Sequence, residues 1–216
     1  MTFSLNEIET MGKRAARGAG LSWGLAEEAG KAARWLAARG LPGPDQLAEI
    51  LTLNDGRSYD DLAPVSIEGE WRAPSDRLCP LVCGAALCDR AGEIAAGREI
   101  ELGPVARPLL LAPYAAAAAR QAGCAIELSW TGAIVVLTPE GVSIDAAPEA
   151  LTARGADHAR CRRVDGPVTA PSADPCAGAV DAETWTRLDA FALRTFAPAT
   201  EASRLAGAGA GLTDND

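Results

Sequence analysis

The order of the local patterns along the chain constrains its fold more than any other sequence feature. Helical periodicity dominates residues 1–52, alternation typical of strands dominates residues 124–164, and a helical pattern returns after residue 181. Helices followed by strands and then by a helix predict an α+β fold rather than alternating βαβ units. We therefore expect a helical N-terminal part, a small antiparallel sheet of three to four strands, and a closing C-terminal helix and tail.

The length and composition fit a single domain spanning residues 1–216. Hydrophobic residues make up 48% of the 216 positions, which is enough for a sizeable core. Within this domain we expect a helical part at 1–52, a mixed segment at 53–123, a β-hairpin region at 124–164, and the C-terminal helix and tail at 181–216.

Capping signals mark the N-terminal helices. Ser4 and Glu7 have the spacing of a capping box, and Ser22 is a suitable cap for a second helix that Gly40 ends. The segment GPDQLAEILTL has the periodicity of a third helix. Three short helices are therefore expected before residue 54.

The strand signal is clearest where CAIELSW and AIVVLT are joined by Thr131 and Gly132, a connection typical of a hairpin. VSID predicts a third strand, and ARCRRV is a candidate for an edge strand. The segment CPLVCGAALCDR fits a buried strand or a short helix equally well. RPLLLAPYAAAAARQAG reads as a helix that Gly123 caps.

Charge and composition exclude several classes of protein. A formal charge of −9 argues against electrostatic binding of nucleic acid, and no apolar run approaches the roughly 20 residues that span a bilayer. The N-terminus lacks a secretory signal, so the six cysteines are interpreted as reduced thiols of a cytoplasmic protein. Scarce lysine with abundant alanine, glycine and arginine is typical of a GC-rich bacterial genome.

The second helix has one side built almost entirely of small residues. Such a side must pack closely against another helix, and Gly30 is then explained by near contact between the two backbones. The small side consists of Leu25, Ala26, Ala29, Gly30, Ala32, Ala33, Leu36 and Ala37.

The other side of this helix is charged, and two interpretations of it stay open. In the first it is a solvated face, with Glu27 and Lys31 paired one turn apart and Trp35 packed on a loop. In the second it lines a pocket, where Glu27 or Glu28 acts as general base and Lys31 and Arg34 hold an anionic substrate. The candidate substrate-binding residues of this helix are then Trp23, Lys31, Arg34 and Trp35.

The terminal segment GAGAGLTDND is also open to two interpretations. It is either a frayed end or a tail folded back, because its glycines let the backbone pass closely along other elements. In the second case Asp214 and Asp216 pair with arginines or line the same pocket. Both are therefore added to the candidate substrate-binding residues.

No pattern identifies a cofactor or a metal site. The cysteines between Cys79 and Cys88 lack the spacing of a structural zinc site, and His158 is the chain's only histidine. The segments GAGLSWG and GAGAGL do not lead from a strand into a helix, as a dinucleotide fingerprint requires. The cysteines are better explained as small buried hydrophobic residues.

Three longer phrases carry a resemblance to a known family: the segment from SLNEIETM to LPG near the N-terminus, CPLVCGAALCDR, and the terminal GAGAGLTDND. They resemble a bacterial domain of unknown function, family 3726, over nearly the whole chain. The resemblance implies a soluble single-domain protein. It implies no activity and no catalytic residues.

Two function hypotheses follow from the sequence. The first is an enzyme that acts on a small anionic metabolite through a carboxylate general base. The second is a non-catalytic subunit or assembly partner of a metabolic enzyme complex, in which the tryptophans and the tail are contact surfaces. A homodimer is the default expectation for either, because symmetric pairs are the commonest oligomers.

Overall fold

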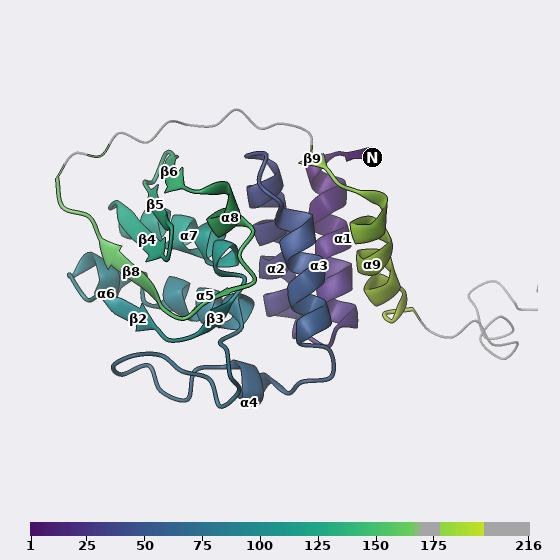
Figure 1. The fold of residues 1–216 in the computed structure, drawn as a ribbon, viewed down its shortest axis with the longest axis horizontal. Coiled ribbons are helices and arrows are strands. Elements are labelled where there is room, and N and C mark those ends of the chain that lie inside the picture. The colour runs from purple at the N-terminus through teal and green to yellow at the C-terminus, as the bar shows by residue number, and fades with distance from the viewer. Residues whose placement is uncertain (167, 169–177, 197–216) are drawn as a thin grey trace, which may run out of the picture.

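The computed structural model describes residues 1–166, 168 and 178–196. Four helices lie side by side at one end of the molecule, and a sheet backed by further helices forms the other end (Figure 1). The α+β class is therefore confirmed, with its helical N-terminal part, antiparallel sheet and closing helix. The helical end consists of α1 (Leu5–Gly18), α2 (Trp23–Ala37), α3 (Gly43–Leu53) and α9 (Ala182–Leu193).

The contact between α1 and α2 follows from the small side of α2. A Cβ atom at Gly30 would lie 2.5 Å from the carbonyl oxygen of Glu9 and 3.0 Å from the backbone nitrogen of Lys13. The two backbones therefore touch at this point, as the sequence predicts. Ser4 and Glu7 form the expected capping box, and the Ser22 side chain caps α2.

The start of the chain is joined to its last described helix. Strand β1 (Thr2–Phe3) pairs antiparallel with β9 (Gly178–Ala179), and the Met1 ammonium group donates to the carbonyl oxygen of Val180 at 2.9 Å. The ring of Phe3 stacks on that of Trp185 with centroids 3.6 Å apart. Helix α9 thereby docks against α1 and α3.

The main sheet is antiparallel and has the order β2–β8–β4–β5–β6. The predicted hairpin joins β4 and β5 at Gly132, whose φ of 79° suits this tight turn. Strand β8 pairs with β2 and β4 at once, so ARCRRV is an interior strand and its prediction as an edge strand is wrong. The strands are β2 (Ile100–Leu102), β8 (Ala159–Arg163), β4 (Ile126–Trp130), β5 (Ala133–Leu137) and β6 (Val142–Ala146).

Helices cover one face of this sheet (Figure 1). Helix α7 (Ala112–Ala122) packs on β4 and β5 and ends at Gly123, as predicted. CPLVCGAALCDR forms helix α5 (Pro80–Asp89), so the helical alternative holds there. This layer also contains α6 (Ala91–Ala95) and the 3₁₀ helix η1 (Pro108–Leu111).

Short elements complete the molecule and join its two ends. Trp71 is fully buried and anchors the loop before α5. Its backbone N–H donates to the carbonyl oxygen of Glu101, and its indole N–H donates to the carbonyl oxygen of Ile67. None of the helices in the described ranges is long and apolar enough to cross a bilayer. The remaining elements are α4 (Tyr59–Leu62), α8 (Pro148–Leu151), and the pair β3 (Val105–Ala106) and β7 (Gly155–Ala156).

Candidate functional site

The charged side of α2 faces solvent, and each of its charged side chains has a partner of opposite charge. Its four ionic side chains all take part in ion pairs, two of them with residues of α1. The pairs are Glu27 with Lys13 at 2.6 Å, Glu28 with Lys31 at 2.7 Å, and Arg34 with Glu9 at 2.8 Å. For Glu27 and Arg34 this is the geometry of the solvated face, the first of the two interpretations. The predicted pairing of Glu27 with Lys31 is wrong, because Glu27 binds Lys13 of α1 and Lys31 binds Glu28.

Two of these ion pairs favour the charged form of one member, Glu27 in the first and Lys31 in the second. The hydrogen bond from Lys13 and its charge lower the pKa of Glu27 below the usual range. The Glu28 carboxylate beside Lys31 raises the pKa of that lysine. A carboxylate with a lowered pKa is a weaker proton acceptor than an unperturbed one.

The two tryptophans of α2 lie in different surroundings. Trp23 is 62% exposed, with the guanidinium of Arg17 5.0 Å from its ring centroid. Trp35 is half-buried, with Arg39 3.8 Å above its ring. Together with Glu28 and Lys31, Trp35 lines a cavity of about 80 Å³ against α7. That volume is enough for only a few water molecules.

Asp214 and Asp216 lie outside the described residues. The structure therefore brings Glu28, Lys31 and Trp35 to one small cavity and places Glu27 and Arg34 on the solvated face beside it. Trp23 is not among the residues that line this cavity.

A different cleft, between the helical end and the sheet end of the molecule, is lined by four arginines. It has a volume of about 790 Å³ and is lined from α3, α9, β7 and the residues that flank it, the segments before α5 and η1, and the turn between β4 and β5. We call it the arginine cleft. Its charged lining residues are Arg77, Arg107, Arg154, Arg187, Glu49 and Asp157. Cations outnumber acids here two to one, although the whole chain carries a charge of −9.

Arg107 is held in the cleft by its backbone as well as its side chain. Its φ of 47° and ψ of 60° place it in the left-handed region, which is uncommon for a residue with a side chain. Its backbone N–H donates to the carbonyl oxygen of Arg154 at 3.2 Å, and its guanidinium forms an ion pair with Glu49. Strained backbone of this kind persists where the surroundings hold it, often at binding sites.

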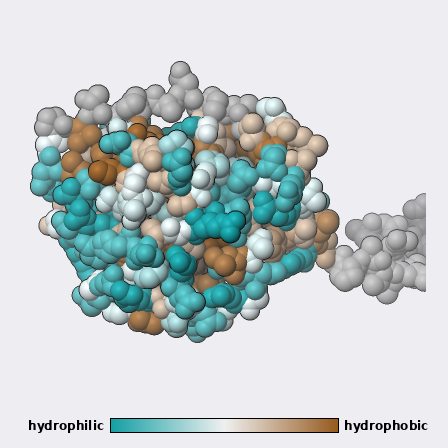
Figure 2. Space-filling model, viewed as in Figure 1, coloured by the Kyte–Doolittle hydropathy of each residue, from teal (hydrophilic) through white to brown (hydrophobic). Residues whose placement is uncertain are grey.

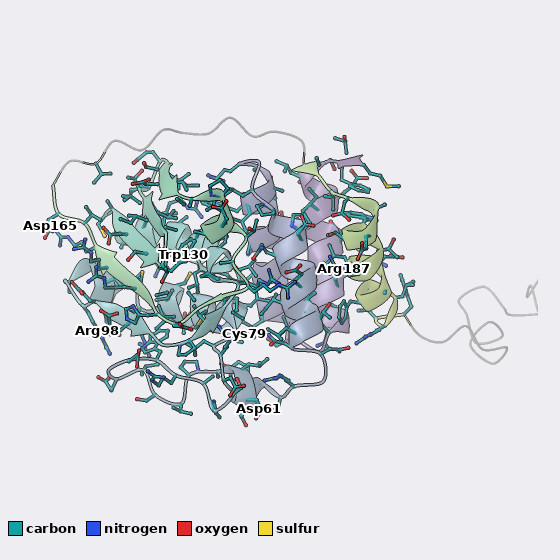
Figure 3. The ribbon with its side chains drawn as sticks, in the orientation of Figure 1. Asp61, Cys79, Arg98, Trp130, Asp165 and Arg187 are labelled. Carbon is teal, nitrogen blue, oxygen red and sulfur yellow. The ribbon has the colours of Figure 1, made fainter. Side chains whose placement is uncertain are left out.

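Arg187 reaches the cleft from α9 (Figure 3). One of its terminal nitrogens donates to the Thr184 hydroxyl at 3.3 Å, and that hydroxyl donates to Asp45 at 2.6 Å. Its Nε is buried and has no hydrogen-bond partner among the described residues. A buried guanidinium nitrogen without a partner is costly, and an anionic ligand would satisfy it.

Arg77 and Arg154 are exposed, and neither forms an ion pair with a described residue. Gly155 makes room for Arg77, because a Cβ atom at that position would overlap the Arg77 guanidinium. Three of the four arginines in the cleft thus have no carboxylate partner in the described part of the chain. This excess of unpaired guanidinium groups distinguishes the cleft from the charged side of α2.

The cysteines are structural rather than reactive. The five described cysteines are free, and burial raises the pKa of Cys83 well above its usual range and that of Cys161 to about 12. The thiols of Cys83 and Cys161 are therefore neutral at physiological pH and poor nucleophiles. Within the described residues no group of three or more His, Cys, Asp or Glu side chains is placed to hold a metal ion.

The sequence did not predict the arginine cleft. Its four arginines are 30 to 47 positions apart and carry no shared motif. The pairing of β3 with β7 and the bridge between Leu78 and Val105 bring Arg77, Arg107 and Arg154 together, whereas Arg187 alone comes from the helical end. The unusual backbone of Arg107 also has no sequence signal, since a glycine is the residue that usually marks a positive φ.

The fold and this cleft define an α+β protein with a cationic site between a helical bundle and an antiparallel sheet. Residues 3–79 match the model of a family described as Protein of unknown function (DUF3726). The match confirms the resemblance for the N-terminal part, from α1 through α4 to Cys79, and does not extend over nearly the whole chain as the sequence phrases predict. A search of curated proteins finds no match.

Among solved structures, the chain is similar to malate dehydrogenase from Entamoeba histolytica, with a TM-score of 0.51 and 12% sequence identity. The similarity covers 68% of this chain and 49% of that one, so the chain spans about half the length of the structure that it matches. At this identity the similarity shows the fold alone.

Proposed function

We propose that the chain binds a small metabolite with two carboxylate groups in the arginine cleft. The observation that carries this proposal is the group of three arginines without carboxylate partners among the described residues, one of which has a buried Nε that no described residue satisfies. The sequence hypothesis of a small anionic metabolite is kept, while its site moves from α2 to the cleft.

The arrangement of the cleft favours two anionic groups over one. A guanidinium binds a carboxylate through two parallel hydrogen bonds, so each carboxylate needs one well-placed arginine. Arg187 comes from α9 on the helical side, whereas Arg154 and Arg77 come from the segments beside β7. A ligand with a carboxylate at each end would contact both sides at once. Malate, which the structurally similar dehydrogenase is named for, is such a dicarboxylate.

A proton acceptor is also available in this cleft. Asp157 lines it, is exposed, and forms no ion pair with a described residue. We assign to Asp157 the role of general base that the sequence gave to Glu27 or Glu28. Glu28, Lys31 and Trp35 share a cavity of about 80 Å³, which is small for a metabolite, so they are the lesser candidate site.

Isothermal titration of the purified chain with malate, succinate and acetate tests this function. We expect saturable binding of both dicarboxylates and much weaker binding of acetate. The double variant Arg154→Ala with Arg187→Ala should lose the binding, because it removes cations from both sides of the cleft. The matched control, Lys31→Ala with Arg34→Ala, also removes two cations but leaves the cleft intact and should bind as the wild type does.

Equal loss of binding in the two double variants would overturn the assignment to the cleft, and loss only in the control would return the site to α2. If a dicarboxylate is consumed as well as bound, Asp157→Asn should stop the turnover and keep the binding. Retained turnover in that variant would remove Asp157 from the role of base.

The second candidate function, an assembly partner, has one observation in its favour. Two aromatic rings are more than half exposed at one end of the helical bundle, Trp23 beside Arg17 and Phe196 beside Arg14. Large exposed apolar side chains mark contact surfaces when they gather in one patch. Sedimentation of the wild type and Trp23→Ser tests this surface. A dimer that Trp23→Ser dissociates would support it, and a wild-type monomer would remove the homodimer from the proposal.

A further inference from the structure

A second cavity, of about 600 Å³, lies on the other side of α3 from the arginine cleft. Leu51 and Asn54 line this cavity, whereas Glu49 and Thr52 line the cleft. The walls come from the connection between α1 and α2, the end of α3, helix α4 and one side of α5 along its whole length. In size it falls within the range of ordinary small-molecule sites.

The interior of this cavity is apolar. Leu51, Leu62, Leu81 and Val82 are buried core residues that also line it. Cys79, labelled in Figure 3, is 1% exposed and borders the same space. Burial raises the pKa of its thiol, so it adds no charge. The inner part of the cavity therefore suits a hydrocarbon rather than a charged group.

One edge of the cavity is polar and carries a cation. Asn54, Arg57 and Tyr59 follow one another in the connection from α3 to α4, and all three line the cavity. The backbone N–H of Arg57 donates to the carbonyl oxygen of Asn54 at 3.0 Å, and Gly56 has a φ of 76°. This tight turn holds Arg57 at the edge of the cavity.

Arg57 is the one cation among the residues that line the cavity, and it forms no ion pair with a described residue. Asp89, at the end of α5, is the one lining acid. The cavity thus combines apolar walls with a single free guanidinium and two further polar side chains beside it. A cationic edge over an apolar interior is complementary to an anionic head on an apolar body.

We propose that this cavity binds a monocarboxylate with an apolar body, its carboxylate on Arg57 and its hydrocarbon between α3 and α5. The site is distinct from the arginine cleft in its residues and in its ligand. A failure of one proposal therefore leaves the other standing. Medium-chain fatty acids and aryl-alkyl acids share this chemistry, and the choice of probes separates them.

Isothermal titration of the full chain with octanoate, 3-phenylpropionate and octylamine tests the site. We expect saturable binding of at least one of the two acids and no binding of octylamine, whose ammonium head would meet Arg57. The stronger of the two acids identifies which apolar body the walls fit.

Two variants locate the binding. Arg57→Gln removes the charge and should weaken binding about tenfold. Ala86→Leu on α5 fills the space from a half-buried position of the cavity wall, keeps a good helix former, and should abolish binding. Arg160→Gln, on the exposed side of the sheet, is the matched control for the loss of one arginine and should bind as the wild type does.

The proposal is overturned if neither acid binds, or if octylamine binds as well as octanoate, which would indicate unspecific apolar association. It is also overturned if both Arg57→Gln and Ala86→Leu bind like the wild type while keeping its melting temperature. Titration with succinate in the same variants should be unchanged, because the arginine cleft is untouched.

Discussion

The charged side of α2 and the arginine cleft contain the same kinds of side chain and differ in how these are matched. On α2 every cation has a carboxylate within 2.8 Å, and all of the pairs are exposed. In the cleft, Arg107 alone among the four arginines is paired with a described residue, and Arg187 has a buried nitrogen without a partner in the same part of the chain. Figure 2 shows hydrophilic residues over much of the face in view, with hydrophobic residues between them.

The comparison teaches that unmatched charge is the better indicator of a ligand. An exposed ion pair is already satisfied and contributes little to stability or binding. An arginine held beside other arginines is not satisfied until an anion arrives. The four predictions below test this difference, from the largest expected effect to the smallest.

Reversing a charge in each region should separate them most clearly. Arg187→Glu is expected to lower the affinity for succinate by at least about 100-fold, because it removes a bidentate donor and adds a repelling carboxylate. Arg34→Glu makes the same change of charge on α2 and should leave the affinity within about twofold. Both are measured by titration calorimetry, and similar losses in the two variants would contradict the comparison.

Glu49→Gln should leave one more arginine of the cleft without a carboxylate partner. Arg107 then loses its ion-pair partner while its side chain stays 13% exposed. We expect a loss of about 1–3 kcal/mol in the free energy of unfolding and an affinity for succinate several-fold higher. Urea unfolding with and without succinate measures both effects. An unchanged affinity would show that Arg107 does not face the ligand.

Asp45 adds a pH-dependent element next to the cleft, linked to Arg187 through Thr184. Burial raises the pKa of Asp45 above its ordinary value of 3.8, and the hydrogen-bonding Asp181 carboxylate adds to the rise. A raised carboxyl pKa in the folded state stabilises the fold at acidic pH, and this stabilisation is lost as the pH rises through that pKa.

Asp45→Asn removes the ionised form and should therefore raise the melting temperature at pH 7 by about 2 °C. At a pH below 3.8 the variant should gain nothing, because Asp45 is protonated there in both states. Thermal melts across this range provide the measurement. An equal gain at both pH values would show that the effect is unrelated to ionisation.

Breaking a matched pair on α2 should have the smallest effect. Glu27→Gln and Lys13→Gln each remove one member of an exposed pair, so neither should change the melting temperature or the affinity for succinate measurably. Thermal melts and titration check this. A clear loss of affinity in Glu27→Gln would revive the pocket on α2.

Much of the fold could be predicted from local signals. The capping box at Ser4, the cap at Ser22 and the turn at Gly132 each act over a few residues, and α1, α2 and the β4–β5 hairpin form where those signals place them. The near contact at Gly30 was predictable too, since small residues on one helical side leave no other way to fill the space.

What could not be predicted depends on residues far apart in the chain. Strand β2 lies in a segment without clear periodicity. Because β2 pairs with β8, β8 becomes an interior strand of the sheet. The arginine cleft was missed for the same reason. A single helix such as α2 shows its charges in the sequence, whereas Arg77 and Arg187 meet in a cleft only after both ends of the molecule have folded together.

The central claim is that arginines without carboxylate partners form the anion site. NMR of the arginine side-chain Nε–H groups during a titration with succinate tests it most directly. Saturable shifts are expected for Arg154 and Arg187, with the Arg34 signal unmoved. Shifts of similar size in Arg34 and Arg187, or none in the cleft at saturating succinate, would contradict the arginine cleft as an anion site.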